Sequence, residues 1–323
     1  MTETIELKER IEELIECKYD GFDSRLAELK CESGIDDVEL SCKFYYLTFK
    51  GGQPSIDEFI DFIYWKAIYF CIPYSKRKAY VDKYLATSDL RYWQDLSDKA
   101  KQLFIRAKSQ KLTTGEPGEL ILFILLEAVM KAPQIVCKMN LKTSTNMPVH
   151  GSDAIHISYD DGTGMLCLYW GESKLRAEVS TALDETCESI VNFIGDKETG
   201  VPRQRDLEII RDHITIVDDK LKTQILKYLD PYEPESNNIE ECFACFVGFE
   251  YNLLSRLHTL GRNQLAKQFE SKYLERAISA ANLFRDKIKE NDIKHLKFVF
   301  FLVPFRDLRE LRSKFLRKLG VLE

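Results

Sequence analysis

The stretch Gly151–Lys174, GSDAIHISYDDGTGMLCLYWGESK, decides the fold. Two β-prone runs with alternating side chains flank the turn-forming sequence DDGTG, a pattern typical of an antiparallel hairpin. A two-residue turn at Gly162 and Thr163 pairs residues whose numbers sum to 325, and this register sets Asp153 opposite Glu172. Opposed residues share one face of the sheet, with Cβ atoms about 5 Å apart.

Lys174 follows Glu172 by two residues and therefore points to the same face of its strand. A turn one residue earlier would set Asp153 opposite Trp170 and would still keep the three charged groups on one face. A three-residue turn centred on Gly162 would separate them. The two-residue turns thus bring two carboxylates and one ammonium to one end of the hairpin.

These three groups together suit the hydrolysis of a phosphodiester. Asp153 and Glu172, with a backbone carbonyl and waters, supply the oxygen ligands that Mg²⁺ prefers. The metal polarises the phosphate and lowers the pKa of a bound water, while Lys174 orients that water and stabilises developing charge. Other acid-x-Lys triplets occur in the chain, but this one ends an apolar strand opposite an acid. The alternative is a surface salt bridge, which is disfavoured because burying three charged groups without a metal is costly.

Three segments carry a resemblance to a known family: GELILFILLE at 118–127, GSDAIHI at 151–157 and LYWGESK at 168–174. They resemble the HamA family, the nuclease subunit of the Hachiman anti-phage system. The resemblance covers residues 115–193 by motif, and the remainder only in layout. It implies a PD-(D/E)xK nuclease fold that degrades DNA beside a helicase subunit.

The same resemblance implies a role for each site residue. Glu119 corresponds to the acid of the core helix, Asp153 to the first strand acid, and Glu172 with Lys174 to the acid-x-Lys pair. Asp153, Glu172 and Glu119 would then hold Mg²⁺, or Mn²⁺ in its place. Ser152 stands where the motif has proline, a departure that changes the motif but not the chemistry.

Several other residues compete for a place in the site. Glu116 and Glu127 are alternatives to Glu119, because a carboxylate in the first turn of a helix also favours the helix dipole. His150 could contact a phosphate. His156 lies an odd number of residues from Asp153, so it points to the other side of the strand, in the core or at the surface. By analogy with the superfamily, the following helix would add a polar residue, with Arg176 and Ser180 as candidates.

The rest of the chain predicts an α/β fold, with a mixed central sheet flanked by helices as in restriction endonucleases. Residues 1–110 form a mixed α+β domain for docking or regulation, and residues 111–323 form the nuclease domain. Expected strands lie at 38–49, 135–141, 154–159, 165–170, 242–250 and 296–303. Expected helices lie at 4–17, 55–70, 76–85, 90–107, 115–130, 178–193, 220–228, 264–289 and 306–319.

Composition sets limits on location and partners. The chain has 323 residues, of which 45% are hydrophobic and 30% charged, and a net charge of −6 that neither requires nor excludes nucleic acid. No apolar stretch reaches the roughly 18 residues needed to span a membrane. The charged N-terminus lacks the apolar centre of a signal peptide, so we expect a cytoplasmic protein. Nine unevenly spaced cysteines suit a reducing compartment.

Two further motifs have simple explanations. Cys242 and Cys245 form a single CxxC inside an apolar run, which predicts core residues because zinc needs four ligands. The basic last helix has an apolar stripe of Leu308, Leu311 and Phe315, so packing explains it, with a track for DNA phosphates as the alternative. Two other functions stay open: a restriction-type endonuclease that reads a specific sequence, and a non-catalytic binding module on a nuclease fold.

Overall fold

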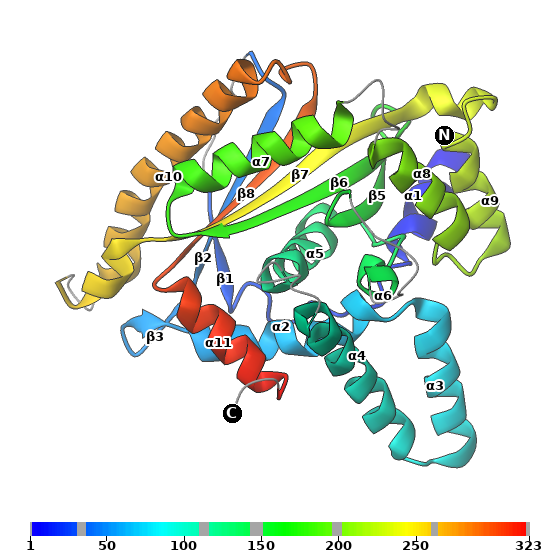
Figure 1. Ribbon diagram of the computed structural model, residues 1–323, viewed down its shortest axis with the longest axis horizontal. Helices are drawn as coiled ribbons and strands as arrows, with labels where there is room; N and C mark the ends of the chain where they lie inside the picture. Colours follow the sequence, from blue (N-terminus) through cyan, green and yellow to red (C-terminus); the bar gives the residue numbers. More distant parts are fainter. Residues whose placement is uncertain are drawn as a thin grey trace. The chain divides into compact units, whose positions relative to one another are not determined.

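The computed structural model describes residues 2–30, 37–109, 116–142, 151–195, 202–259 and 264–320. It has a mixed α/β fold with a six-stranded mixed sheet in the order β1-β2-β8-β7-β6-β5 (Figure 1), as the sequence predicts. The strands of this sheet are β1 (Leu26–Leu29), β2 (Leu40–Leu47), β5 (Ala154–Asp160), β6 (Met165–Arg176), β7 (Ile239–Glu250) and β8 (Lys297–Phe305). The short strands β3 (Phe49–Lys50) and β4 (Gln53–Pro54) pair separately.

The helices follow the predicted ranges closely, with one addition near residue 140 and another after residue 201. They are α1 (Thr2–Glu12), α2 (Ile56–Cys71), α3 (Tyr74–Thr87), α4 (Arg91–Ser109), α5 (Glu116–Met130), α6 (Lys138–Lys142), α7 (Val179–Ile194), α8 (Pro202–His213), α9 (Asp219–Tyr228), α10 (Leu265–Glu290) and α11 (Leu308–Lys318). Among the helices of the described ranges, none is both long and apolar enough to cross a membrane.

Contacts along the chain separate two compact units. Unit 1 comprises Met1–Lys18, Trp65–Gly171 and Phe193–Glu241, and unit 2 comprises Tyr19–Tyr64, Glu172–Asn192 and Cys242–Glu323. The predicted boundary between residues 110 and 111 falls outside the described ranges, and the predicted division into two domains stays a prediction.

The β5–β6 hairpin of unit 1 has the predicted register. The pairs run from Ala154↔Gly171 to Asp160↔Met165, so the residue numbers sum to 325 throughout. The loop holds four residues rather than two, and Gly164 closes it with φ +72° and an N–H that donates to the Asp160 carbonyl at 2.8 Å. The longer loop leaves the register unchanged because it is extended by one residue on each side.

The helix α5 packs against one face of this hairpin. Its apolar run from Leu120 to Leu126 is buried, as the sequence predicts. A Cβ on Gly171 would lie 2.7 Å from the Cβ of Ala154 and 3.0 Å from Cδ2 of Leu122, so only glycine permits this close approach. Ala154 and Gly171 therefore mark the face of the hairpin that α5 covers.

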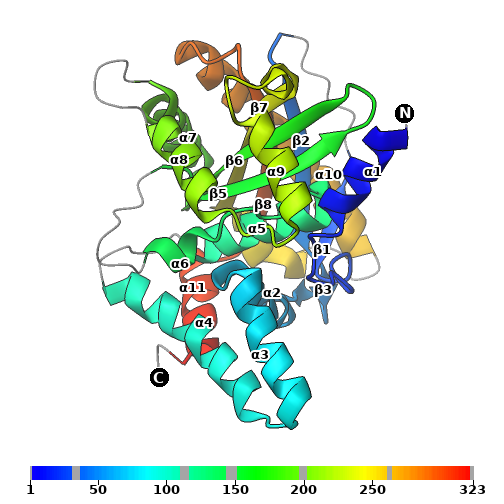
Figure 2. The same cartoon turned by 90° about the vertical axis from the view of Figure 1, so that its right-hand side faces the viewer.

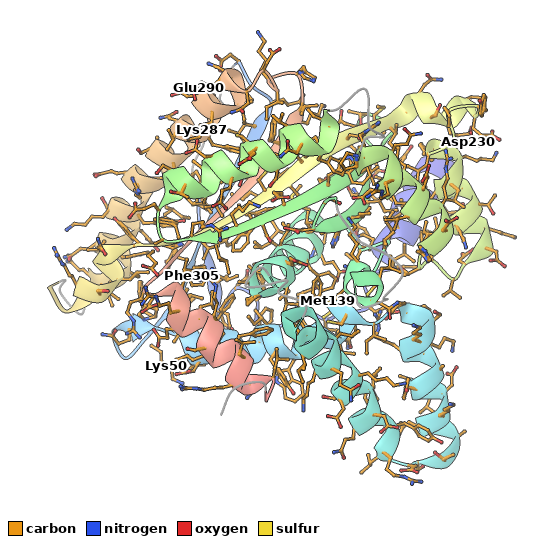
Figure 3. All side chains as sticks on the ribbon, viewed as in Figure 1. Lys50, Met139, Asp230, Lys287, Glu290 and Phe305 are labelled. Atoms are coloured by element: carbon orange, nitrogen blue, oxygen red, sulfur yellow. The ribbon has the colours of Figure 1, made fainter. Side chains whose placement is uncertain are left out.

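Unit 2 is built around strands β2, β8 and β7, which run parallel in this order. Both faces of β8 are buried, as expected of parallel strands whose two faces are covered. The ring of Phe284 in α10 lies 4.9 Å from that of Phe300 on one face. On the other face the ring of Phe305, labelled in Figure 3, lies 6.3 Å from that of Phe59 in α2.

One predicted strand is wrong. Residues 135–141 form a turn and the short helix α6, and the neighbouring Gln134 makes only an isolated bridge to His156. The alternating sequence suits a strand, but Lys138 is 2% exposed and forms an ion pair within unit 1, which takes the segment away from the sheet. The four-residue strand β1 and the polar helix α8 were not predicted.

Helices α3 and α4 form a helical hairpin in unit 1 (Figure 2). All residues of α3 are described, and none of them is buried. The rings of Tyr84 and Trp93 pack together near the tip at 5.8 Å between centroids. Leu85 and Leu90 are exposed there, so the tip presents apolar side chains to solvent.

Candidate functional site

Glu172 and Lys174 come together on strand β6 as predicted. Lys174 Nζ donates to Glu172 Oε1 at 2.5 Å. The side chain of Lys174 is 18% exposed and that of Glu172 is 12% exposed. Residues two apart on a strand share a face, which explains the contact. The charges of both groups also act on the buried thiol of Cys245 in β7, whose pKa is raised mainly by burial.

The helix α7 supplies polar partners to this face of β6. Lys174 Nζ donates to the hydroxyl of Ser189 at 3.1 Å, so the ammonium is held between Glu172 and α7. Arg176 Nε donates to Glu185 Oε1 at 2.8 Å. Later residues of the helix meet earlier residues of the strand, which places Ser189 beside Lys174 and Glu185 beside Arg176, and a role for the candidate Ser180 stays a prediction.

Asp153 lies at the residue before the hairpin ladder, and its side chain is half-buried. Its N–H donates to the carbonyl of Gly171 at 2.7 Å. In the β5–β6 register, the numbers of paired residues sum to 325. The numbers of Asp153 and Gly171 sum to 324, so the pairing of the two chains is shifted by one residue at Asp153. Asp153 is therefore tied to the residue before Glu172, and its pairing with Glu172 stays a prediction.

Glu119 lies in the first turns of α5 and is 7% exposed. Its charge acts on the buried thiol of Cys71, whose pKa burial raises well above its usual range. The competing Glu127 is also buried, and its Oε1 accepts from the N–H of Gln134 at 3.2 Å. The side chain of Glu116 is outside the described part of the chain. The role of Glu119 beside a metal stays a prediction.

Two predictions about neighbouring groups concern histidine and cysteine. His156 is fully buried, its Nδ1 is 2.8 Å from the Ala132 carbonyl, and burial lowers its pKa to about 4. It is therefore a core residue, which is one of the two positions predicted for it, the core or the surface. His150 lies outside the described residues. Cys242 and Cys245 are buried in β7, which confirms them as core residues.

The described residues include no group of three His, Cys, Asp or Glu side chains arranged to hold a metal ion. This does not conflict with Mg²⁺, which is commonly bound through one or two carboxylates and keeps several waters. Glu172 of unit 2 has a partly buried carboxylate, and Asp153 of unit 1 is half-buried just before β5, so metal binding by the two together stays a prediction. The oxygen donor set fits a hard cation such as Mg²⁺ or Mn²⁺ better than zinc.

A family model named HamA matches residues 22–319. The chain belongs to the HamA family. This membership points to a component of Hachiman defence, a system with more than one component. The match includes Glu119, Asp153, Glu172 and Lys174 within its span. A comparison with curated proteins finds no match.

The basic helix α11 of this HamA chain is a packed helix rather than a free row of cations. Leu308, Leu311 and Phe315 are buried, which confirms the predicted apolar stripe. Three basic side chains of the helix have partners within unit 2, and these are Lys314 with Asp57, Lys318 with Asp61, and Arg312 with the Leu175 carbonyl. Arg306, which precedes the helix, pairs with Glu310. These partners favour the packing explanation over a track for DNA phosphates.

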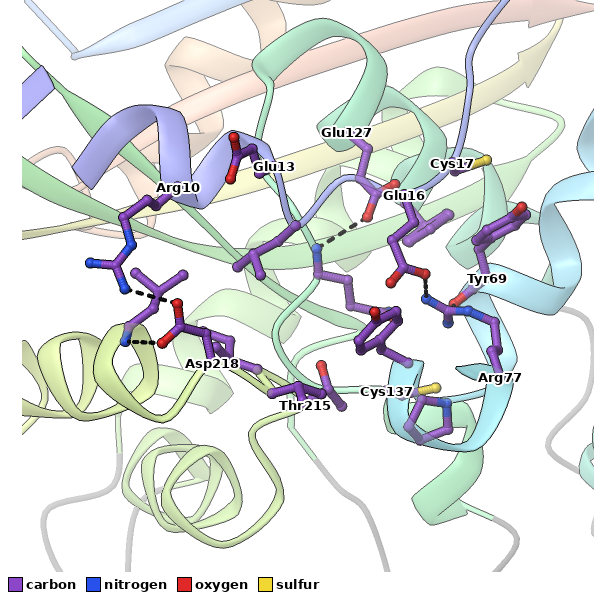
Figure 4. A pocket seen from close by; sticks show the side chains of 18 residues that line it. Arg10, Glu13, Glu16, Cys17, Tyr69, Arg77, Glu127, Cys137, Thr215 and Asp218 are labelled. Atoms are coloured by element: carbon purple, nitrogen blue, oxygen red, sulfur yellow. Dashed lines mark hydrogen bonds and ion pairs between the residues drawn. The ribbon is translucent and has the colours of Figure 1, made fainter. Parts of the chain in front are cut away.

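The HamA chain also has a pocket of about 440 Å³ in unit 1 (Figure 4). Two ion pairs lie in its wall, Arg77 with Glu16 at 2.6 Å and Arg10 with Asp218 at 2.9 Å. Its other described lining residues are Glu13, Leu14, Cys17, Tyr69, Pro73, Tyr74, Phe123, Glu127, Gln134, Cys137, Thr215, Ile216, Val217 and Leu221. None of the four predicted catalytic residues is among them, so the pocket has no part in the proposed reaction.

Proposed function

We propose that this chain is a Mg²⁺-dependent DNA nuclease of the PD-(D/E)xK type and the effector of a Hachiman defence system. The observation that carries the proposal is the contact between Lys174 and Glu172 at 2.5 Å on β6. Asp153, which directly precedes β5, donates its N–H to the carbonyl of Gly171 on β6. The HamA family supports the role in defence.

Asp153 and Glu172 would hold the metal. Glu119 is proposed as a third carboxylate on the family resemblance alone, because α5 covers the face of the hairpin marked by Gly171 and not that of Glu172. The metal, when bound, polarises the scissile phosphate and lowers the pKa of a coordinated water. Lys174 would be the cation at the reacting phosphate, because Glu172 and Ser189 hold its ammonium beside the proposed metal ligand Glu172.

The reaction is the hydrolysis of one phosphodiester bond. The water oxygen attacks phosphorus, the bond from phosphorus to the leaving oxygen breaks, and a proton reaches that oxygen. Lys174 stabilises the negative charge that gathers on the phosphoryl oxygens in the transition state. The carboxylate of Glu172 holds the ammonium in place for this role, since the ion pair fixes both side chains on one face of β6.

A helicase subunit of the same system would deliver the DNA in the cytoplasm. At a net charge of −6 the chain has little long-range attraction for a polyanion. A partner that already holds DNA removes this handicap. It also offers a means of restraint, which a nuclease without evident base recognition needs inside its host.

Cleavage of a plasmid under Mg²⁺ tests the proposal, with Lys174→Ala beside the parent chain. Lys78→Ala is a matched control, because Lys78 forms an exposed ion pair with Asp82 on α3. We expect a smear of fragments from the parent and the control, and intact plasmid from Lys174→Ala. Discrete bands would support a restriction-type endonuclease. Intact plasmid in every lane, with the helicase subunit present, would support a non-catalytic binding module.

A further inference from the structure

Ser152, the residue before Asp153, has all three of its polar groups bound by two buried charges. Its N–H donates to Asp206 Oδ2 at 3.0 Å, and its hydroxyl donates to the same oxygen at 2.7 Å. Lys138 Nζ donates to the Ser152 carbonyl at 2.5 Å and to the Ser152 hydroxyl at 3.2 Å. Lys138 and Asp206 also pair directly, with 2.8 Å between Nζ and Oδ2.

The two charges come from separate helices of unit 1. Lys138 begins α6 and Asp206 lies in α8, and their side chains are 2% and 0% exposed. A buried ion pair is weak evidence for stability, because apolar residues of the same size often stabilise a fold as well or better. The position of this pair, on the backbone next to Asp153, therefore suggests another role.

The backbone at Gly151 passes very close to the carboxylate of Asp206. Gly151 has φ +138°, and a Cβ there would lie 2.6 Å from Asp206 Oδ1. Only glycine therefore allows the chain to pass Asp206 before it reaches Ser152. Oδ1 of Asp206 has no hydrogen-bond partner among the described residues, and Oδ2 accepts from Ser152 and Lys138.

We propose that Lys138 and Asp206 are positioning residues that hold the backbone of Ser152 and so aim the carboxylate of Asp153. The inference rests on the proposed function, in which Asp153 is a metal ligand. Proline would fix the φ of a residue covalently. Here the bonds to the N–H, carbonyl and hydroxyl of Ser152 fix it, and the bond from the Asp153 N–H to Gly171 fixes the next residue.

The test is the double variant Lys138→Met/Asp206→Leu in the full chain, which replaces both charges by apolar groups of similar size. We expect the thermal midpoint to stay unchanged or to rise. Hydrogen exchange at the amides of Ser152 and Asp153 should become at least about 10-fold faster, because the clamp that Lys138 and Asp206 form on the Ser152 backbone is lost. The cleavage rate at saturating DNA should fall about 100-fold with the Kd for DNA unchanged, since a small displacement of a ligand has an effect of this size.

Two further variants make the test specific. Lys78→Gln/Asp82→Asn removes an exposed ion pair of unit 1 and should match the parent in both readouts. Ser152→Gly leaves the buried ion pair in place but removes the hydroxyl and loosens the backbone, so it should lower the cleavage rate and not the affinity for DNA. It also decides the matter if the double variant does not fold.

The hydrogen-exchange readout does not depend on nuclease activity. A folded variant whose Ser152 and Asp153 amides exchange as in the parent would overturn the clamp. Faster exchange with an unchanged cleavage rate would overturn its role in positioning Asp153. A parent chain that fails to cut DNA would overturn the proposed function, while the exchange rates would still decide whether the clamp exists.

Discussion

The ammonium of Lys174 lies 2.5 Å from Oε1 of Glu172, two residues away on strand β6. Glu172→Gln keeps an oxygen that accepts from Lys174 but removes the charge that a metal needs. We expect cleavage under Mg²⁺ to fall at least about 100-fold. The free energy of unfolding should fall by no more than about 2 kcal/mol, because the hydrogen bond is retained. Plasmid cleavage and urea unfolding measure the two effects.

Glu235→Gln is the matched control for this substitution. Glu235 also pairs with a lysine, Lys227, at 3.4 Å, and lies in unit 1 outside the proposed site. Its substitution should leave cleavage at the parental rate. Equal cleavage by Glu172→Gln and the parent would remove Glu172 from the metal site, and unfolding of Glu172→Gln would give it a structural role instead.

The carboxylates of Asp153 and Glu172 should hold a single metal ion, with about 3–6 Å between them if the shift at Asp153 keeps both side chains at the same end of the hairpin. Titration with Mn²⁺ checks this through Asp153→Asn, Glu172→Gln and the double variant. If both residues bind one ion, each single change removes most of the affinity and the double change removes little more. Losses that add would place the two residues at separate sites.

Burial of His156 should make the protein less stable in acid. Its folded-state pKa of about 4 lies below the ordinary value of 6.5, so the unfolded chain binds the extra proton first as pH falls. This contribution to stability is present above pH 6.5 and is lost as pH falls through about 4. Between pH 7 and pH 5 the loss is about 2 kcal/mol.

Urea unfolding of the parent and of His156→Asn at the two pH values isolates this contribution. Asparagine can keep a donor near the Ala132 carbonyl, which His156 Nδ1 contacts at 2.8 Å. It does not titrate in this range. The difference in stability between pH 7 and pH 5 should therefore be smaller in the variant by about 2 kcal/mol. An equal pH dependence in both proteins would show that His156 is not the titrating group.

The hairpin shows how far local sequence determines structure. Its register depends on alternating side chains and a central turn, both of which are visible in residues 151–174, so the pairing from Ala154↔Gly171 onward was predictable. The contact of Lys174 with Glu172 follows from the same alternation. Ser189 was missed because its place opposite Lys174 depends on how α7 runs along the strand.

The Lys138–Asp206 pair shows where sequence reasoning fails. Its members are 68 residues apart, and neither has a motif or a spacing that indicates the other. A lysine in the alternating run at 135–141 reads as the exposed face of a strand, whereas burial of its charge requires the distant carboxylate. The predicted strand is wrong for this reason, and the polar helix α8 that carries Asp206 was missed as well.

The first 110 residues also contribute directly to the sheet. Strand β2 pairs in parallel with β8 from Leu40↔Phe298 to Phe44↔Leu302, and both strands belong to unit 2. Removing residues 1–107 would expose the apolar edge of β8. We therefore expect such a truncated chain to misfold, so docking of a partner is better tested by point substitutions.

We propose that the tip of the α3–α4 hairpin, which exposes apolar side chains, docks the proposed helicase subunit. Leu85 and Leu90 are 70% and 69% exposed, and they lie beside Tyr84 and Trp93, whose residue types are enriched at interface hot spots. Leu85→Ser/Leu90→Ser should weaken the affinity for the helicase at least about 10-fold. The thermal midpoint should not change, because neither side chain is buried. Ile278→Ser on α10 is the matched control, since Ile278 is also exposed but lies in unit 2. Equal affinities for all three proteins, measured by calorimetry, would place the docking surface elsewhere.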